Sequence, residues 1–156
     1  ANLKKGKIDD RINFLNKLTN KLNNINYDFY GFKNKEPIWG NNFYQALVNS
    51  KMGLNLSRGL PTKYYSSNRI ASLIGNGLLT FIDKKTEIND FFTKDEIVLY
   101  DNIEDLSQKI KYFKNNPKIR KKIASKGKKK YFKLFNELKI TKYIIDTSLG
   151  KEAKLY

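Results

Sequence analysis

Short apolar runs alternate with longer segments of helical periodicity along this chain, and this alternation restricts the fold more than any other feature. Three of the runs, at residues 52–56, 78–82 and 96–100, are too apolar to expose one face to water. Strands of that kind are typical of a parallel sheet that helices cover on both faces. The sequence therefore predicts an α/β fold with a doubly wound parallel sheet.

Periodicity and capping residues predict the other elements of this fold. A further strand is expected at 27–30, closed by Gly31, and Pro117 is expected to open a helix that Gly127 interrupts. Gly75, Asn76 and Gly77 predict a helix C-cap and a tight turn into the next strand. The remaining helices are expected at 7–25, 42–50, 66–74, 87–92, 103–113 and 141–149.

The length of 156 residues suits one hydrophobic core, so residues 1–156 are expected to form a single domain. Doubly wound domains usually begin with a strand, yet only Ala1–Leu3 precede the first predicted helix. The first strand is therefore expected to be truncated here or to lie upstream.

The composition excludes several kinds of chemistry. The chain has no Cys and no His, which removes disulfides, thiolate and imidazole metal ligands, and every catalytic dyad that needs His. No metal site is expected. The longest apolar runs are too short to cross a bilayer and no signal peptide opens the chain, so a soluble, cytoplasmic protein is expected.

The net charge of +16 indicates nucleic acid or an anionic membrane surface as a partner. Almost all of this charge is Lys, however, and the four Arg residues are few for reading bases or clamping phosphates. Joint enrichment in Lys, Asn and Ile also fits a genome rich in A and T. The run Lys126–Lys133 is either a solvated helix face or a contact with a membrane or an acceptor.

Ligands of open parallel sheets bind beyond the carboxyl ends of the strands, where helix N-termini favour phosphates. Gly31 with Phe32, the segment Asn55–Arg58, and the helix start at Ser66–Arg69 follow strands in this way. Arg69 would add a cation to the helix start; alternatively Ser66 only caps its helix and Arg69 is solvated. Aromatic residues are candidates either for stacking on a base or for the core: Tyr30, Phe32, Trp39 and Tyr44.

The order of these features resembles the C-terminal domain of group 1 glycosyltransferases, in the branch related to spore-maturation glycosyltransferase-like proteins. The resemblance covers about Arg11–Ile145. It rests on an Arg-led helix, a Gly, an apolar strand, an acidic-apolar strand and a helix that ends near Gly. These features stand at Asn68–Ile70, Gly77–Thr80, Glu96–Tyr100, Glu104–Leu106 and Asn116–Gly127, with 27–32 and 54–57 upstream.

The resemblance implies one Rossmann-like half of a GT-B glycosyltransferase, which binds a nucleotide sugar as substrate and uses no cofactor. Gly31 and Phe32 would hold the base through backbone contacts. The diphosphate and the sugar would meet Tyr65, Ser66, Ser67, Asn68 and Arg69. The acceptor, a glycan, lipid or protein, would bind the N-terminal GT-B domain, which is absent here.

Two positions depart from the family pattern. Many retaining relatives carry two Glu residues where this chain has Tyr64 and Ser72, so the ribose contact falls on Ser72. The family's Arg and Lys after the first strand match Lys5, Lys7 or Arg11, and no catalytic residue is identified. A noncatalytic glycosyltransferase-like domain and a basic binding module are the alternatives. The wide spread of Lys favours the enzyme, with no nucleic acid partner and with association at the inner membrane surface left open.

Overall fold

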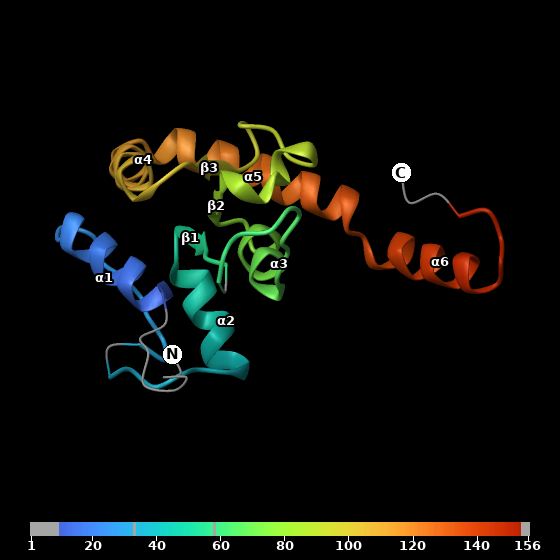
Figure 1. Ribbon diagram of the computed structural model, residues 1–156, viewed down its shortest axis with the longest axis horizontal. Coiled ribbons are helices and arrows are strands. Elements are labelled where there is room, and N and C mark those ends of the chain that lie inside the picture. Colours follow the sequence, from blue (N-terminus) through green and yellow to red (C-terminus); the bar gives the residue numbers. More distant parts are fainter. Residues whose placement is uncertain (1–9, 33, 58, 154–156) are drawn as a thin grey trace.

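The computed structural model describes residues 10–32, 34–57 and 59–153 of the chain. Within that part a small parallel sheet is surrounded by helices, and the last helix extends away from the body (Figure 1). The elements are α1 (Asp10–Lys21), α2 (Gly40–Asn49), β1 (Met52–Asn55), α3 (Asn68–Gly75), β2 (Leu79–Asp83), the 3-10 helices η1 (Lys84–Thr86) and η2 (Ile88–Asp90), β3 (Val98–Tyr100), α4 (Ile103–Asn115), α5 (Pro117–Leu134) and α6 (Glu137–Ser148).

The three strands of the described part lie in the order β1-β2-β3, and both pairs are parallel. Met52 is opposite Leu79 in the first pair, and Phe81 is opposite Val98 in the second. These are the three apolar runs of the sequence, so their assignment as strands is confirmed. The α/β fold class with a Rossmann-like single domain is confirmed with them.

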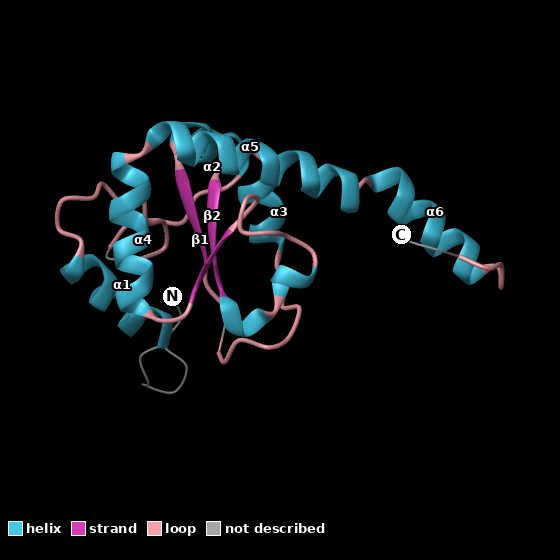
Figure 2. Cartoon of the chain, turned by 90° about the horizontal axis from the view of Figure 1, so that it is seen from above, coloured by secondary structure: helices cyan, strands magenta, loops and turns pink. Residues whose placement is uncertain are grey.

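Helices cover both faces of this sheet (Figure 2). Leu79 and Phe81 of β2 belong to a core cluster that includes Leu18 of α1 and Leu106 of α4. Ile82 points to the opposite face, because side chains alternate along a strand, and packs in a second cluster with α3 and η2. Both faces of the sheet are therefore buried, which explains why the strand sequences have no polar face.

Local capping interactions explain where several elements start and stop. The Asn102 side chain accepts a hydrogen bond from the Asp105 amide at 2.9 Å, and the Asp105 carboxylate accepts one from the Asp101 amide at 3.0 Å. This reciprocal arrangement satisfies amides at the start of α4. At the end of α3, Gly77 takes a positive φ of 77° and the Leu78 amide donates to the Leu73 carbonyl. The predicted helix C-cap and turn are thus confirmed.

Gly127 does not interrupt α5, so that prediction is wrong. The helix continues from Pro117 to Leu134, with Pro117 in its first turn as expected. Gly127 is buried against the backbone of Glu96, and a Cβ at this position would overlap the Glu96 carbonyl oxygen. The glycine permits close approach of the helix to the strand connection, which a sequence pattern does not distinguish from a break.

The segment at 27–30 is not a strand of the sheet, contrary to the prediction. Its side chains contact one another and the core, with the rings of Tyr27 and Phe29 stacked at 5.2 Å.

Residues 87–92 form one turn of 3-10 helix at η2 rather than a longer helix, and α6 begins at Glu137. The helix expected at 7–25 spans Asp10–Lys21, while Ala1–Leu3 lie outside the described residues. No helix in the described ranges is both long and apolar enough to cross a bilayer.

Candidate functional site

The carboxyl end of β1 carries polar groups that the protein leaves unpaired. Asn55 is 1% exposed and accepts a hydrogen bond on Oδ1 from the Ser67 hydroxyl at 3.1 Å. Its Nδ2 atom has no hydrogen-bond partner among the described residues, and neither has the buried Oγ of Ser57. Buried polar atoms without partners are rare in folded proteins, because each costs about 1–3 kcal/mol. The end of β1 therefore carries unmet hydrogen-bonding capacity, in atoms that are shielded from solvent.

The N-terminus of α3 lies directly above this strand end. Ser67 is the N-cap residue, with an extended backbone at φ −117°, but its side chain makes no capping hydrogen bond. Its hydroxyl bonds to Asn55 instead, so the first-turn amides of α3 are not occupied by that side chain. The Ile70 amide donates to the Ser67 carbonyl at 2.9 Å, while the positive end of the helix dipole favours an anion at this helix start.

A backbone carbonyl at the same strand end holds the Arg69 side chain. One guanidinium nitrogen, Nη1, donates to the Leu56 carbonyl at 2.7 Å, and the side chain is otherwise exposed. Since a guanidinium has five N–H groups, this bond positions the cation while donors remain for a ligand. Arg69 is thus oriented before any anion arrives.

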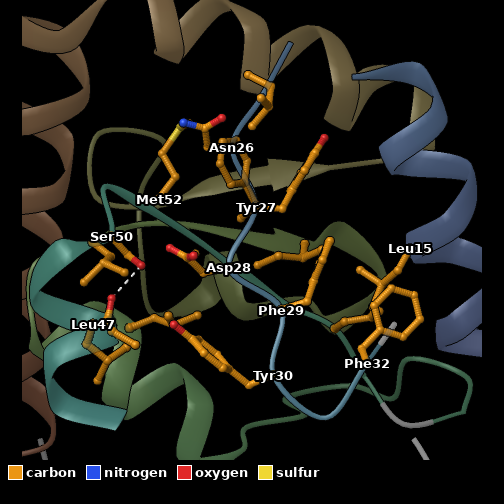
Figure 3. Close-up of a pocket in the computed structure, with 18 of the residues that line it drawn as sticks. Leu15, Asn26, Tyr27, Asp28, Phe29, Tyr30, Phe32, Leu47, Ser50 and Met52 are labelled. Carbon is orange, nitrogen blue, oxygen red and sulfur yellow. Dashed lines mark hydrogen bonds between the residues drawn. The ribbon is translucent and has the colours of Figure 1, made fainter. Parts of the chain in front are cut away.

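A cavity of about 1070 Å³ runs along the free edge of β1, between α1, the segment 24–32 and α2 (Figure 3). Gly31, Phe32 and Arg69 all line it, together with Leu56 at the carboxyl end of the strand. Its size is at the upper end of the range of roughly 300–1000 Å³ found for small-molecule sites. The cavity connects the predicted base-binding residues with the predicted phosphate-binding cation.

The charges that line this cavity are unbalanced. Its described lining contains one carboxylate, Asp28, and five cations: Arg11, Lys51, Arg69, Lys114 and Arg120. Lys114 and Arg120 donate to backbone carbonyls, those of Asn24 and Phe113, and are thereby fixed in place. An excess of four positive charges in one concave site favours an anionic ligand.

Aromatic side chains form one wall of the cavity. Phe29 and Phe32 meet edge to face at 5.2 Å on the side of Leu15, while Asp28 and Tyr30 point toward the end of α2 (Figure 3). Burial raises the pKa of the Tyr27 phenol to about 12, and its hydroxyl is 3.3 Å from the Leu22 carbonyl, to which it donates. Because Phe29 points to one side and Asp28 and Tyr30 to the other, side chains alternate along this segment as they would in a strand, although the segment is not paired with β1.

The carboxyl ends of β2 and β3 differ from that of β1, because their charged groups pair with one another or with backbone groups. The Asp83 carboxylate accepts from the Lys85 amide at 2.9 Å, and Lys84 forms an ion pair with Asp101 at 3.1 Å. Lys109 donates to the Leu99 carbonyl at 2.8 Å and to Asp105 at 2.7 Å. These groups stabilise turns and helix starts, so the second and third strand ends have a structural role.

The residues predicted to bind the donor do not all reach the cavity. Tyr65, Ser66, Ser67 and Asn68 stand beside Arg69, on the loop and first turn of α3, but they do not line it. Of the stacking candidates, Tyr30 and Phe32 line the cavity, whereas Trp39 and Tyr44 are 73% and 61% exposed. Lys5, Lys7 and Arg58 lie outside the described residues.

The two positions that depart from the family pattern are used within the chain. The Tyr64 hydroxyl donates to Asp90 at 2.6 Å, and this bond raises the pKa of the phenol. Tyr64 has a left-handed backbone conformation, with φ 55°. Its amide N–H donates a hydrogen bond to the Thr86 carbonyl, and this bond stabilises the conformation. Ser72 donates to the Asn68 carbonyl of its own helix at 2.9 Å, so a ribose would have to displace that bond.

Sequence reasoning named the segment Asn55–Arg58 as a strand end where a ligand could bind, but it gave no binding role to Ser57 or to the amide of Asn55. The available signal was their polarity at the end of an otherwise apolar run, where a buried polar group needs a partner. It also missed Lys114 and Arg120, which approach the cavity from distant helices. Within the part that the structure describes, no three His, Cys, Asp or Glu side chains gather in a way that could hold a metal ion.

Comparison with known proteins identifies the family. The sequence model of the family described as glycosyl transferase-like matches residues 11–141, which is well over half of the 156 residues. No curated protein and no solved structure matches the chain. The matched region contains the three strands of the described part, α2 to α5, α1 except its first residue, and the residues of the β1 strand end. The chain therefore belongs to the glycosyl transferase-like family.

Proposed function

We propose that this chain is the donor-binding half of a GT-B glycosyltransferase, in the branch related to spore-maturation glycosyltransferase-like proteins. The observation that carries the proposal is the cavity beside β1, which has Phe32, Gly31 and Arg69 in its wall and an excess of positive charge. A nucleotide sugar has an aromatic base at one end and an anionic diphosphate in the middle, which matches this distribution. Membership of the glycosyl transferase-like family supports the same substrate class.

In this proposal Arg69 and the first-turn amides of α3 bind the diphosphate, while Gly31 and Phe32 contact the base. Transfer breaks the bond between the sugar's anomeric carbon and the diphosphate oxygen, and that oxygen takes the electron pair. The acceptor oxygen forms the new bond to the anomeric carbon, and its proton passes to the leaving diphosphate. The cation and the amides stabilise the charge that develops on the leaving diphosphate. The acceptor is a glycan, lipid or protein and binds the second GT-B half.

The experiment is a thermal-shift screen of the chain with nucleoside diphosphates, nucleotide sugars, inorganic diphosphate and free nucleosides. We expect at least one nucleotide to raise Tm, since a ligand at 100 times its Kd stabilises the folded state by about 2.7 kcal/mol. Inorganic diphosphate should give a smaller shift. If Phe32→Ala abolishes the extra shift from the nucleoside part but keeps that from diphosphate, the two ends of the site are separated.

If no nucleotide shifts Tm while inorganic diphosphate does, the cavity binds an anion but not a donor, and the proposal is wrong. Sugar transfer by this chain alone would contradict a mechanism that needs two halves. Both outcomes can be read in the same preparation, because binding and transfer are measured separately.

A noncatalytic glycosyltransferase-like domain is the second candidate. The hydrogen bonds of Tyr64 to Asp90 and of Ser72 to Asn68 favour it, because positions that carry Glu in many relatives serve internal contacts here. Nucleotide binding without transfer, in a protein that contains both halves, would distinguish this candidate from the enzyme.

A further inference from the structure

The last helix of the described chain is apolar but buries none of its side chains. α6 has no buried residue; Leu138 and Ile145 of this helix are 74% and 50% exposed, and Leu149, its C-cap, is 63% exposed. Figures 1 and 2 both show α6 projecting from the body beyond the end of α5. Contiguous exposed apolar side chains usually mark an interaction site.

Apolar side chains are exposed on several sides of α6. At 3.6 residues per turn, Leu138, Ile145 and Leu149 fall on one side of the helix, and Tyr143 and Ile144 fall on other sides, also exposed. Lys139, Lys142 and Asp146 form a charged stripe on one flank of the Leu138 side, where Lys142 and Asp146 pair at 2.6 Å, and Glu137 lies on the other flank. The helix therefore exposes an apolar side bordered by charged residues.

The adjoining helix α5 presents a basic face. Lys118, Lys122, Lys129 and Lys133 lie on one outward side, at a spacing of four, seven and four residues, and all are exposed. The sequence of α5 contains no Asp or Glu, and Phe132 on the same side is 48% exposed. Like charges one turn apart repel each other weakly, and an anionic surface relieves this repulsion.

We propose that the outward face of α5 and the helix α6 together bind the surface of an anionic lipid bilayer. The lysines contact lipid headgroups, and the apolar side chains of α6 enter the interface between headgroups and acyl chains. A second copy of the chain would bring two basic faces together, which charge repulsion opposes. Nucleic acid would pair with the lysines but would leave α6 exposed, and Arg120, the guanidinium of α5, is turned inward to the Phe113 carbonyl. This interaction is independent of the donor site.

The first test is co-sedimentation with vesicles of phosphatidylcholine, alone or with one third phosphatidylglycerol. We expect binding to the anionic vesicles, weakened by salt. Each Lys near such a surface contributes a factor of about five, so exchanging four should reduce partitioning on the order of 600-fold. The exchanges are Lys118→Gln, Lys122→Gln, Lys129→Gln and Lys133→Gln.

The matched control removes the same charge from exposed lysines elsewhere. It should retain most of the binding, because its positions are scattered: Lys51→Gln, Lys85→Gln, Lys94→Gln and Lys111→Gln. Equal losses in both variants would show that net charge alone drives binding, and the proposed face would be wrong. No binding of the unaltered chain to anionic vesicles would overturn the proposal outright.

The second test addresses α6. Leu138→Ser, Ile145→Ser and Leu149→Ser should reduce partitioning by about tenfold or more, whereas Val48→Ser with Leu60→Ser, also highly exposed, should not. Separately, Ile144→Trp in a Trp39→Phe background should shift its emission to the blue on binding anionic vesicles. An unshifted emission, a concentration-dependent dimer lost in the triple Ser variant, or tighter binding to duplex DNA than to vesicles would each overturn the proposal.

Discussion

The carboxyl end of β1 and the carboxyl ends of β2 and β3 lie on one edge of the same sheet, yet they are built differently. At β2 and β3, carboxylates and lysines pair with each other and with backbone groups, as in the contacts of Asp105 with the Asp101 amide and with Lys109. At β1, Asn55 and Ser57 keep buried polar atoms that pair with no described residue, and Arg69 uses a single bond to a carbonyl.

This difference separates structural polarity from polarity that a ligand can use. A saturated network adds stability and has little left to offer a substrate. An unsaturated one is costly in the free protein and is relieved by binding. The two places also differ in residue type: the β2 and β3 ends pair the carboxylates of Asp101 and Asp105 with lysines, whereas the β1 end has an amide, hydroxyls and one guanidinium.

The sharpest way to break this comparison is to remove one cation from each place. Arg69→Ala should weaken binding of the nucleotide that raises Tm in the thermal-shift screen by about 2–3 kcal/mol, because a charged hydrogen-bond donor to phosphate is lost. Lys84→Ala, whose ion pair with Asp101 is exposed, should leave both nucleotide binding and stability nearly unchanged. Calorimetric titration measures nucleotide binding by both variants, and urea unfolding measures their stability. Equal losses would mean that the strand ends are not functionally distinct.

The saturated network should reveal itself in stability rather than in binding. Asp105→Ala removes the partner of the Asp101 amide and of Lys109, and should lower the free energy of unfolding by about 1.5 kcal/mol. Burial opposes ionisation of Asp105, but the hydrogen bonds from Lys109 and the Asp101 amide outweigh it and hold the pKa below its ordinary value.

Because that pKa is depressed in the folded state, the stabilisation is present above the unfolded value of about 3.9 and is lost as pH falls through the folded pKa. The difference in urea midpoint between the parent chain and Asp105→Ala should therefore shrink in acid. A difference that stays constant from neutral pH to pH values below the folded pKa would show that the carboxylate charge is not what stabilises this end.

Two serines with equal exposure provide a matched pair at the two places. Ser57 and Ser107 are both 6% exposed, but only Ser107 has a partner, the Ile103 carbonyl at 2.7 Å. Ser107→Ala should cost about 1 kcal/mol of stability and leave binding intact. Ser57→Ala should not destabilise the free chain, and it should reduce the thermal shift caused by the nucleotide. A loss of stability in Ser57→Ala with an unchanged thermal shift would show that Ser57 does not contribute to nucleotide binding.

The smallest effect is expected at Tyr100, whose hydroxyl is buried without a partner among the described residues although it belongs to β3. Burial, and then the nearby charge of Asp83, raise the pKa of this phenol, so it stays neutral. Tyr100→Phe removes an unpaired polar atom and should stabilise the chain by less than about 1 kcal/mol. A loss of stability on denaturant unfolding would reveal a hydrogen bond to this hydroxyl.

Much of the fold could be predicted because its signals are local. Apolar runs at 52–56 and 78–82 determine strands, Pro117 opens a helix, and Gly77 supplies a positive φ at a helix end. The failures involve contacts between distant segments. Gly127 reads as a break, but it is a point of close packing against Glu96, and residues 27–30 alternate like a strand without pairing with β1.

The candidate site divides in the same way. The sequence by itself determined that helix and strand alternate, that Arg69 follows a strand at the start of a helix, and that His and Cys chemistry is excluded. Only the tertiary structure decided that Gly31, Phe32 and Arg69 line one cavity, and that Asn55 and Ser57 remain unpaired beside it. The reason is physical: propensity and periodicity act over a few residues, whereas the pairing of a polar atom depends on which distant groups the packed core brings within hydrogen-bond reach.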